Sequence, residues 1–293
     1  MSEPTREEPM REDRGHRTRN LWLVSLAYGG AFLLLYFTAV LTAFGQLVDA
    51  GSLSLFGWMR SEAWLAFYDG RDIVMYCVVG AAVVAALSDV LEHRWKAPLY
   101  SAALVGVVAV ISLLMKEFAP RPDLGDWAYA HNTFPSGHTA ITLAAAVAII
   151  WCYPRWMSPV LVLVLGGVVA FVALGSLFSM AHRASDSIGG ALLAGAVSCA
   201  LAALSRATQP VSSRLRRGSV IAGGVMVGVG LLYLAGALGF FGGGDHALTL
   251  TMAILLCTLG VIVSVLAIHR PFLVQARTRA RPGGDRAPRT PVT

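Results

Sequence analysis

Long runs of apolar residues alternate with short polar segments along most of the chain. Eight of these runs approach the length of about 20 residues that a membrane-spanning helix needs. They cover residues 21–44, 72–92, 98–117, 137–153, 158–180, 186–205, 218–240 and 247–268. The pattern predicts an all-α fold: a polytopic integral membrane helical bundle with about eight transmembrane helices.

The composition agrees with a membrane protein. Hydrophobic residues make up 56% of the 293 residues and charged residues only 14%, whereas a soluble domain carries roughly a quarter charged residues. The net charge of +6 is compatible with nucleic-acid binding. However, the arginines flank the apolar runs, so orientation in a bilayer explains them better. We therefore expect the lipid bilayer as a partner and no nucleic acid.

The basic residues also predict the orientation. If the N-terminus lies inside, the inner segments hold 18 of the 23 Lys and Arg residues. By the positive-inside rule, both termini are then cytoplasmic in a multi-pass protein of the cell membrane. No cleavable signal peptide is recognisable, so the first apolar run should remain as an anchor.

The spans divide the chain into four regions. We expect residues 1–20 and 270–293 to be disordered cytoplasmic tails, because both are polar and rich in charge or in Pro and Gly. Residues 21–210 form a six-span core, and residues 211–269 add a two-helix C-terminal extension. The long aromatic loop 45–71 suggests a segment at the lipid interface, or alternatively a lid over a lipid access path.

Glycines occur in pairs within the apolar runs. The chain shows neither a Walker loop nor a dinucleotide fingerprint, so these pairs are not assigned to nucleotide binding. We expect Gly166-Gly167, Gly189-Gly190 and Gly223-Gly224 to permit close helix packing.

Two short polar stretches lie at the mouths of apolar runs. Pro135-Ser136-Gly137-His138 opens the fourth run, where backbone N–H groups at a helix start can face an anion and His138 can move a proton. His182 and Asp186 lie four residues apart, which places them on one face of a helical turn. A carboxylate on one imidazole nitrogen leaves the other nitrogen free to attack phosphorus.

Positive charges accompany these histidines. Lys116, Arg121 and Arg183 fall on the same predicted outer side, where they can neutralise a phosphate group. Cations in place of a carboxylate cluster suggest a site that needs neither a metal nor another cofactor. A structural hydrogen-bonded pair, or a zinc site, is the alternative for His182 and Asp186. Zinc usually requires a third protein ligand, and neither Cys nor Glu is placed to supply it.

The order of these residues resembles the type 2 phosphatidic acid phosphatase superfamily. Lys116…Arg121-Pro122, Pro135-Ser136-Gly137-His138 and His182-x-x-x-Asp186 are similar to its three motifs. The superfamily includes lipid phosphate phosphatases, undecaprenyl pyrophosphate phosphatases and vanadium-dependent haloperoxidases. The resemblance covers about residues 72–205 and implies a helical bundle with six membrane spans.

The resemblance also implies roles for these residues. His182 would be the nucleophile of a phosphohistidine mechanism, Asp186 its orienting partner and His138 the general acid. The implied phosphate ligands are Lys116, Arg121, Ser136 and Gly137.

The sequence departs from the family pattern at two positions. The usual arginine position, seven residues after the lysine, holds Asp123, and Arg121 is the candidate for that role. The arginine expected six residues before the last histidine is replaced by Ser176. Arg183 is a candidate substitute, although its side chain could equally face solvent. Phosphate affinity is the property that these changes affect.

The sequence therefore predicts a membrane lipid phosphatase with its site on the extracytoplasmic face. Its substrate would be a lipid phosphomonoester or pyrophosphate of the polyprenyl pyrophosphate, phosphatidic acid or phosphatidylglycerol phosphate type. By family analogy alone, recycling of a polyprenyl carrier is our first choice. A phosphoryl transferase of the same superfamily is one alternative, and a non-enzymatic membrane transporter or scaffold is another.

Overall fold

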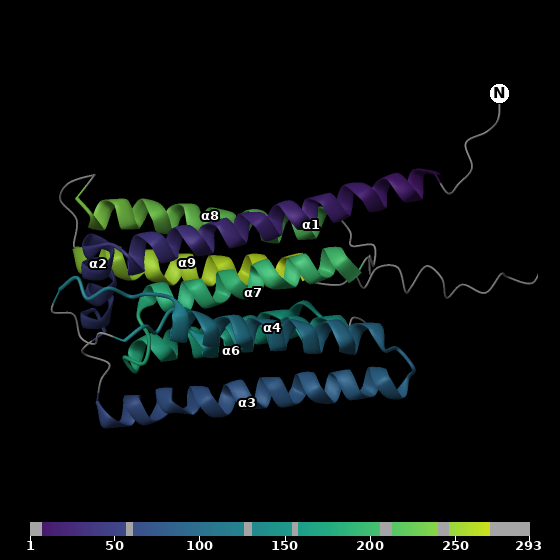
Figure 1. The fold of residues 1–293 in the computed structure, drawn as a ribbon, viewed down its shortest axis with the longest axis horizontal. Coiled ribbons are helices and arrows are strands. Elements are labelled where there is room, and N and C mark those ends of the chain that lie inside the picture. Colours follow the sequence, from purple (N-terminus) through teal and green to yellow (C-terminus); the bar gives the residue numbers. More distant parts are fainter. Residues whose placement is uncertain are drawn as a thin grey trace, which may run out of the picture.

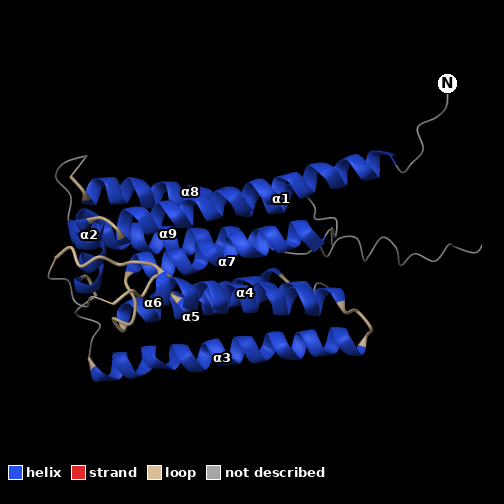
Figure 2. Ribbon diagram, viewed as in Figure 1, coloured by secondary structure: helices blue, strands red, loops and turns tan. Residues whose placement is uncertain are grey.

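The fold of the chain is helical. The computed structural model describes residues 8–56, 61–125, 131–153, 158–205, 213–239 and 246–269. Within these ranges all regular structure is helix (Figure 2). The elements are α1 (Glu8–Leu35), the π-helical segment η1 (Tyr36–Val40), α2 (Ala43–Ser54), α3 (Glu62–Leu91), α4 (Lys96–Phe118), α5 (Gly137–Cys152), α6 (Pro159–Phe178), α7 (Ala184–Ser205), α8 (Ser213–Ala237) and α9 (His246–His269).

Seven stretches of helix in the described part are long and apolar enough to cross a membrane. The first runs from α1 through η1 (Thr18–Val40), and the others lie in α3, α4, α6, α7, α8 and α9. The chain is therefore a multi-pass membrane protein, as predicted. The remaining predicted span, 137–153, is indeed a helix, but α5 has only 16 residues and is shorter than the others.

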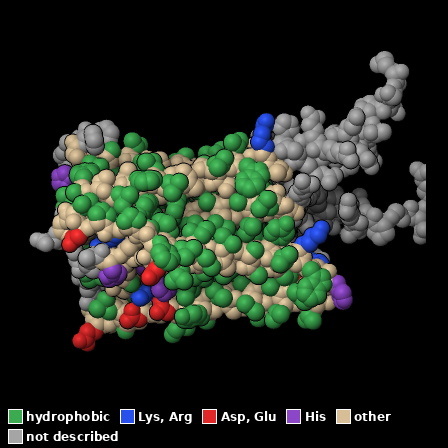
Figure 3. Space-filling view, viewed as in Figure 1, with side chains coloured by type: hydrophobic (Ala, Val, Ile, Leu, Met, Phe, Trp, Pro, Cys, Tyr) green, Lys and Arg blue, Asp and Glu red, His purple; other side chains and the backbone are tan. Residues whose placement is uncertain are grey.

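The long helices run side by side, with their loops gathered at the two ends of the bundle (Figure 1). Charged side chains lie at these two ends, and a wide apolar belt separates them (Figure 3). The start of α1 and the end of α9 lie at one end. The starts of α3, α5 and α7 and the ends of α4 and α6 lie at the other end, which we call the loop end.

The core of the bundle forms around α5. Almost the whole of this Ala-rich helix is buried, including Leu143, Val147 and Ile150. Residues of α3, α4, α6 and α7 pack around it, and so do Val261 and Val265 of α9. Of the expected C-terminal extension, α9 therefore belongs to the core, whereas the outer side of α8 is exposed and apolar.

The chain between α1 and α3 differs from the expected loop. Residues 43–54 form α2, and α3 begins at Glu62, so most of the range 45–71 is helical. Thr42 caps α2 by accepting a hydrogen bond from Gly45 N at 3.0 Å. A Cβ atom on Gly45 would lie 1.8 Å from the Thr38 carbonyl oxygen, so the sharp turn into α2 needs glycine. This turn directs α2 back over the loop end.

The N-terminal helix is longer than expected. Helix α1 begins at Glu8, so residues 8–20 are helical, although we expected a disordered tail over 1–20. Pro9 lies in the first turn, where a missing N–H group costs no intrahelical hydrogen bond, and the residues after it include several good helix formers. Residues 1–7 and the predicted tail 270–293 lie outside the described residues.

The glycine pairs differ in how closely their neighbours approach. A Cβ atom on Gly189 would lie 2.4 Å from the Phe134 ring, and one on Gly190 would lie 2.5 Å from the Ser136 carbonyl oxygen. A Cβ atom on Gly223 would similarly meet the backbone of α9 at 2.8 Å. The prediction of close packing is confirmed for these three glycines. In contrast, Gly167 and Gly224 have no described neighbour within 4 Å of such a Cβ atom.

Candidate active site

The predicted site residues come together at the loop end of the bundle. Lys116 lies in the last turn of α4, His138 in the first turn of α5 and Asp186 in the first turn of α7. His182 precedes α7, and Arg121 follows α4. Residues separated by up to 70 positions in the sequence therefore meet at one end of the molecule.

Asp186 is the buried centre of this site. Its Oδ2 atom accepts hydrogen bonds from Thr133 Oγ1 at 2.5 Å and from the backbone N–H of Arg183 at 2.9 Å. His182 Nδ1 lies 3.4 Å from the same oxygen. Because an ionised carboxylate only accepts hydrogen bonds, Nδ1 of His182 is the donor and carries the proton. The Nε2 atom of His182 then keeps its lone pair, as a nucleophile requires.

His138 of α5 lies next to the His182 ring. The ring centroids of His138 and His182 lie 5.9 Å apart. The other neighbour of His138 is Asp72 of α3, whose Oδ1 atom lies 3.1 Å from Nε2. The two imidazoles, each next to a carboxylate, thus lie close enough to act on one small group between them.

Lys116 lies beside the start of α5. A Cβ atom on Gly137 would lie 3.7 Å from Lys116 Nζ, so the ammonium group lies close to the first helical residue. The N-terminus of a helix carries a partial positive charge and favours anions. The ammonium group and the helix dipole therefore add up to a positive region next to His138.

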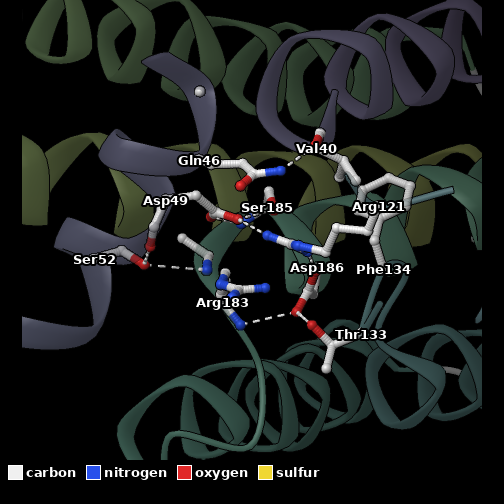
Figure 4. Close-up of polar contacts among 12 residues, drawn as sticks. Val40, Gln46, Asp49, Ser52, Arg121, Thr133, Phe134, Arg183, Ser185 and Asp186 are labelled. Carbon is white, nitrogen blue, oxygen red and sulfur yellow. Dashed lines mark hydrogen bonds and ion pairs between the residues drawn. The ribbon is translucent and has the colours of Figure 1, made fainter. Parts of the chain in front are cut away.

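Arg121 lies deep in the site rather than on its surface. Its side chain is 4% exposed, and its guanidinium group lies between two carboxylates (Figure 4). Nη2 is 3.7 Å from Asp49 Oδ2, and Nη1 is 4.0 Å from Asp186 Oδ1. This cation therefore links α2 to the start of α7 and balances the two buried acids.

Asp49 is a site residue that the sequence analysis missed. Its carboxylate accepts hydrogen bonds from the backbone N–H of Ser185 at 2.9 Å and from the Ser185 hydroxyl at 2.6 Å. Burial raises the pKa of Asp49 to about 6, and the negative charge of Asp186 adds to this effect. An acidic residue within an otherwise apolar segment was the signal available in the sequence.

Ser136 has a different local environment from the one expected. Its hydroxyl caps α5 by accepting hydrogen bonds from the backbone N–H and the hydroxyl of Thr139. Its own N–H donates to the Asp186 carbonyl oxygen at 2.8 Å. The side chain is fully buried, so Ser136 holds the start of α5 against α7, and its N–H is already engaged within the protein.

A comparison with family models bears on this arrangement. Residues 95–209 match the PAP2 superfamily. The match covers about two fifths of the chain and spans α4 to α7, so it contains Lys116, Arg121, His138, His182 and Asp186. The resemblance inferred from the motifs is confirmed. No curated protein and no solved structure matches the chain.

The PAP2 match indicates the general type of chemistry. Members of this superfamily are generally phosphatases, so the match supports phosphatase-type activity on phosphate esters. Asp49 of α2 and Asp72 of α3 contact the site but lie outside the matched range. In the described part of the chain, no three His, Cys, Asp or Glu side chains are grouped so that they could hold a metal ion.

The departure from the PAP2 pattern at Ser176 has a structural counterpart. Ser176, at the usual arginine position, is buried in α6, and its hydroxyl donates to the Val172 carbonyl oxygen at 2.7 Å. Arg183 is 1% exposed, which excludes a side chain that faces solvent. A second arginine, Arg71 of α3, donates from Nη1 to Ser179 Oγ at 2.9 Å, just beyond Ser176. The sequence motifs did not point to Arg71.

Proposed function

We propose that this protein is a metal-independent membrane lipid phosphatase that hydrolyses a lipid phosphomonoester or pyrophosphate through a phosphohistidine intermediate. The observation that carries the proposal is the pair of histidines at the loop end. His182 is held through Nδ1 by Asp186, and His138 faces it with 5.9 Å between ring centroids. The PAP2 match over residues 95–209 supports the phosphate-ester chemistry.

In the first step, His182 Nε2 attacks the phosphorus atom. A P–N bond forms while the P–O bond to the lipid alcohol or lipid phosphate breaks. His138, as an imidazolium, gives its proton to the departing oxygen. The Asp186 carboxylate stabilises the positive charge that develops on His182, because it already holds the Nδ1 proton.

In the second step, water replaces the lipid at phosphorus. Neutral His138 takes a proton from this water, whose oxygen attacks the phosphohistidine. The P–N bond breaks, inorganic phosphate leaves, and both histidines regain their starting protonation states. One water molecule is consumed for each lipid phosphate cleaved.

The phosphate oxygens need positive partners in both steps. Lys116 Nζ and the start of α5 at Gly137 lie next to His138 and can hold the transferring group. Arg121 and Arg183 add two buried guanidinium groups at the loop end. These residues supply the charge neutralisation that a metal ion supplies in other phosphatases.

The position of the site favours a lipid substrate. The site lies at one end of an apolar belt, where a phosphate headgroup is in water while its tail stays in the bilayer (Figure 3). Polyprenyl pyrophosphates and phosphatidic acid have this form. Because α1 begins and α9 ends on the opposite side, and most basic residues flank that side, we place the site on the extracytoplasmic face of the cell membrane.

The test uses the purified full-length protein in detergent micelles with phosphatidic acid and farnesyl diphosphate. We expect release of inorganic phosphate that persists in EDTA and that vanadate inhibits, because vanadate mimics five-coordinate phosphorus. His182→Ala should abolish release, and Arg183→Ala should mainly raise KM. His246→Ala, which changes an exposed histidine at the start of α9, serves as the matched control.

The outcomes separate the alternatives. A strict requirement for added magnesium, or full activity of His182→Ala, would overturn the mechanism. Transfer of the phosphoryl group to an added alcohol in preference to water would identify a transferase. The absence of turnover with every lipid phosphate would favour a transporter or scaffold.

A further inference from the structure

Asp72 and His138 form a contact that the phosphatase motifs do not include. Asp72 lies on α3, outside the residues that match the PAP2 superfamily. Its Oδ1 atom is 3.1 Å from His138 Nε2 and 3.6 Å from Arg71 Nε. The carboxylate therefore lies between an imidazole and a guanidinium group.

Arg71 is the cation next to this carboxylate, and its own position is fixed by hydrogen bonds. Its Nη1 atom donates to the Tyr68 carbonyl oxygen at 3.2 Å and to Ser179 Oγ at 2.9 Å. Tyr68 belongs to α3, whereas Ser179 follows α6 on the way to His182. The Arg71 side chain is 11% exposed, so these contacts join two elements within the protein. Asp72 therefore has a firmly held cation 3.6 Å away on one side and contacts His138 on the other.

The second nitrogen of His138 has a different environment. Nδ1 is buried and has no hydrogen-bond partner among the described residues. His182 shows the reverse arrangement, since its Nδ1 lies against Asp186. The two histidines thus contact their carboxylates through opposite ring nitrogens.

We propose that Asp72 is a positioning residue for the general acid: it holds His138 through Nε2, so that Nδ1 exchanges the proton with the substrate. This inference rests on the proposed phosphatase function. The Asp72 carboxylate keeps a proton on Nε2 throughout the reaction. The neutral ring therefore exists in one tautomer, with the lone pair on Nδ1.

The proton transfers follow directly from this arrangement. In the imidazolium, Nε2–H donates to Asp72 and Nδ1–H protonates the oxygen that leaves phosphorus. The ring that results is neutral, and its Nδ1 then takes the proton of the attacking water. Nε2–H stays on Asp72 in both steps, so His138 can serve as acid and as base without reorientation.

A simple ion pair is the structural alternative, because the Asp72 side chain is 48% exposed and that of His138 is 30% exposed. A double-mutant cycle separates the two explanations. We expect Asp72→Asn to lower kcat/KM for farnesyl phosphate by about 10- to 100-fold. This loss should not exceed the loss caused by His138→Ala. In the His138→Ala background, Asp72→Asn should have no further effect beyond about 2-fold.

Asp69→Asn is the matched control. Asp69 also lies on α3 and pairs with Arg71 at 3.0 Å, but its side chain is 70% exposed. This substitution removes the same charge from the same arginine and should leave kcat/KM within about 2-fold of the wild type. Asp72→Glu, which restores a carboxylate, should recover part of the activity.

The leaving group provides a second readout. Farnesyl diphosphate loses a weakly basic farnesyl phosphate, whereas farnesyl phosphate loses a strongly basic alkoxide that needs a proton. The value of kcat/KM reports the steps up to phosphohistidine formation, in which the leaving group departs. Because the leaving group of the diphosphate needs little protonation, the loss of kcat/KM caused by Asp72→Asn should shrink to about 3-fold or less with this substrate. His138→Ala should show the same dependence.

Three results would overturn the inference about Asp72. They are an equal loss with both farnesyl substrates, a full additional loss in the His138→Ala background, or an equal effect of Asp69→Asn. Failure of the phosphatase proposal looks different. In that case the wild type releases no phosphate, or His182→Ala remains active, regardless of the results with the Asp72 variants.

Discussion

Gly190 of α7 offers a sharp test of how the fold positions the site. A Cβ atom at this position would lie 2.5 Å from the Ser136 carbonyl oxygen. It would also lie 3.2 Å from Ala140 N and from Thr139 Cβ. All three neighbours belong to the start of α5, which carries His138. Gly190→Ala therefore pushes on the helix turn that holds His138, the proposed general acid.

The size of the effect follows from these distances. To reach an ordinary contact distance of 3.4 Å, the contact with the Ser136 oxygen must lengthen from 2.5 Å by about 0.9 Å. A displacement of about 1 Å of a catalytic group costs roughly 100-fold in rate. Overpacking costs about 1–3 kcal/mol of folding free energy, and the better helix propensity of alanine offsets about 0.5–1 kcal/mol of this.

The assay compares kcat for phosphate release with the melting temperature in the same detergent. We expect Gly190→Ala to lower kcat by about 100-fold while the protein still unfolds cooperatively. Gly167→Ala in α6 is the control, because a Cβ atom there meets no described atom within 4 Å. A kcat within 3-fold of the wild type for Gly190→Ala, or an equal loss for Gly167→Ala, would refute the reasoning.

Two further predictions concern the buried carboxylates. The pKa of Asp49 is raised from 3.8 to about 6 in the folded protein. Between these pH values the folded protein binds a proton at Asp49 that the unfolded chain does not. The stability that this proton contributes should be lost as the pH rises through 6. We expect Asp49→Asn to flatten the fall in melting temperature between pH 4 and pH 6, and parallel curves would contradict this. Thr133→Val removes the hydrogen bond of 2.5 Å to Asp186 and should cost about 1–3 kcal/mol of stability. Its kcat should also fall, whereas Thr251→Val, which changes a hydroxyl bonded within α9, should leave kcat unchanged.

The sequence predicted those parts of the site whose geometry is local. The spacing of His182 and Asp186 places their side chains on one turn, as observed. The apolar runs likewise predicted the helices, because hydropathy over 20 residues is a strong signal. Ser136 was recognised at the helix start, but its N–H contacts Asp186, a partner that local pattern does not indicate.

The site residues that the sequence did not reveal reach the site through long-range packing. Asp49 contacts Ser185 across 136 positions, and Asp72 contacts His138 from a different helix. In the sequence, Asp49 is an isolated acidic residue in a mostly apolar stretch, and Asp72 resembles an ordinary charge at a helix boundary. Asp49 reaches the site because the turn at Gly45 folds α2 back. The period of hydrophobic residues does not encode this tertiary contact.

The burial of α5 has a mechanical consequence. Its 16 residues are surrounded by protein along nearly their whole length, so it need not match the thickness of the hydrocarbon layer. The longer helices around it meet the acyl chains instead. His138 thus lies on an inner helix. A change in bilayer thickness can affect its position only through neighbouring helices such as α3, the lipid-facing helix that bears Asp72.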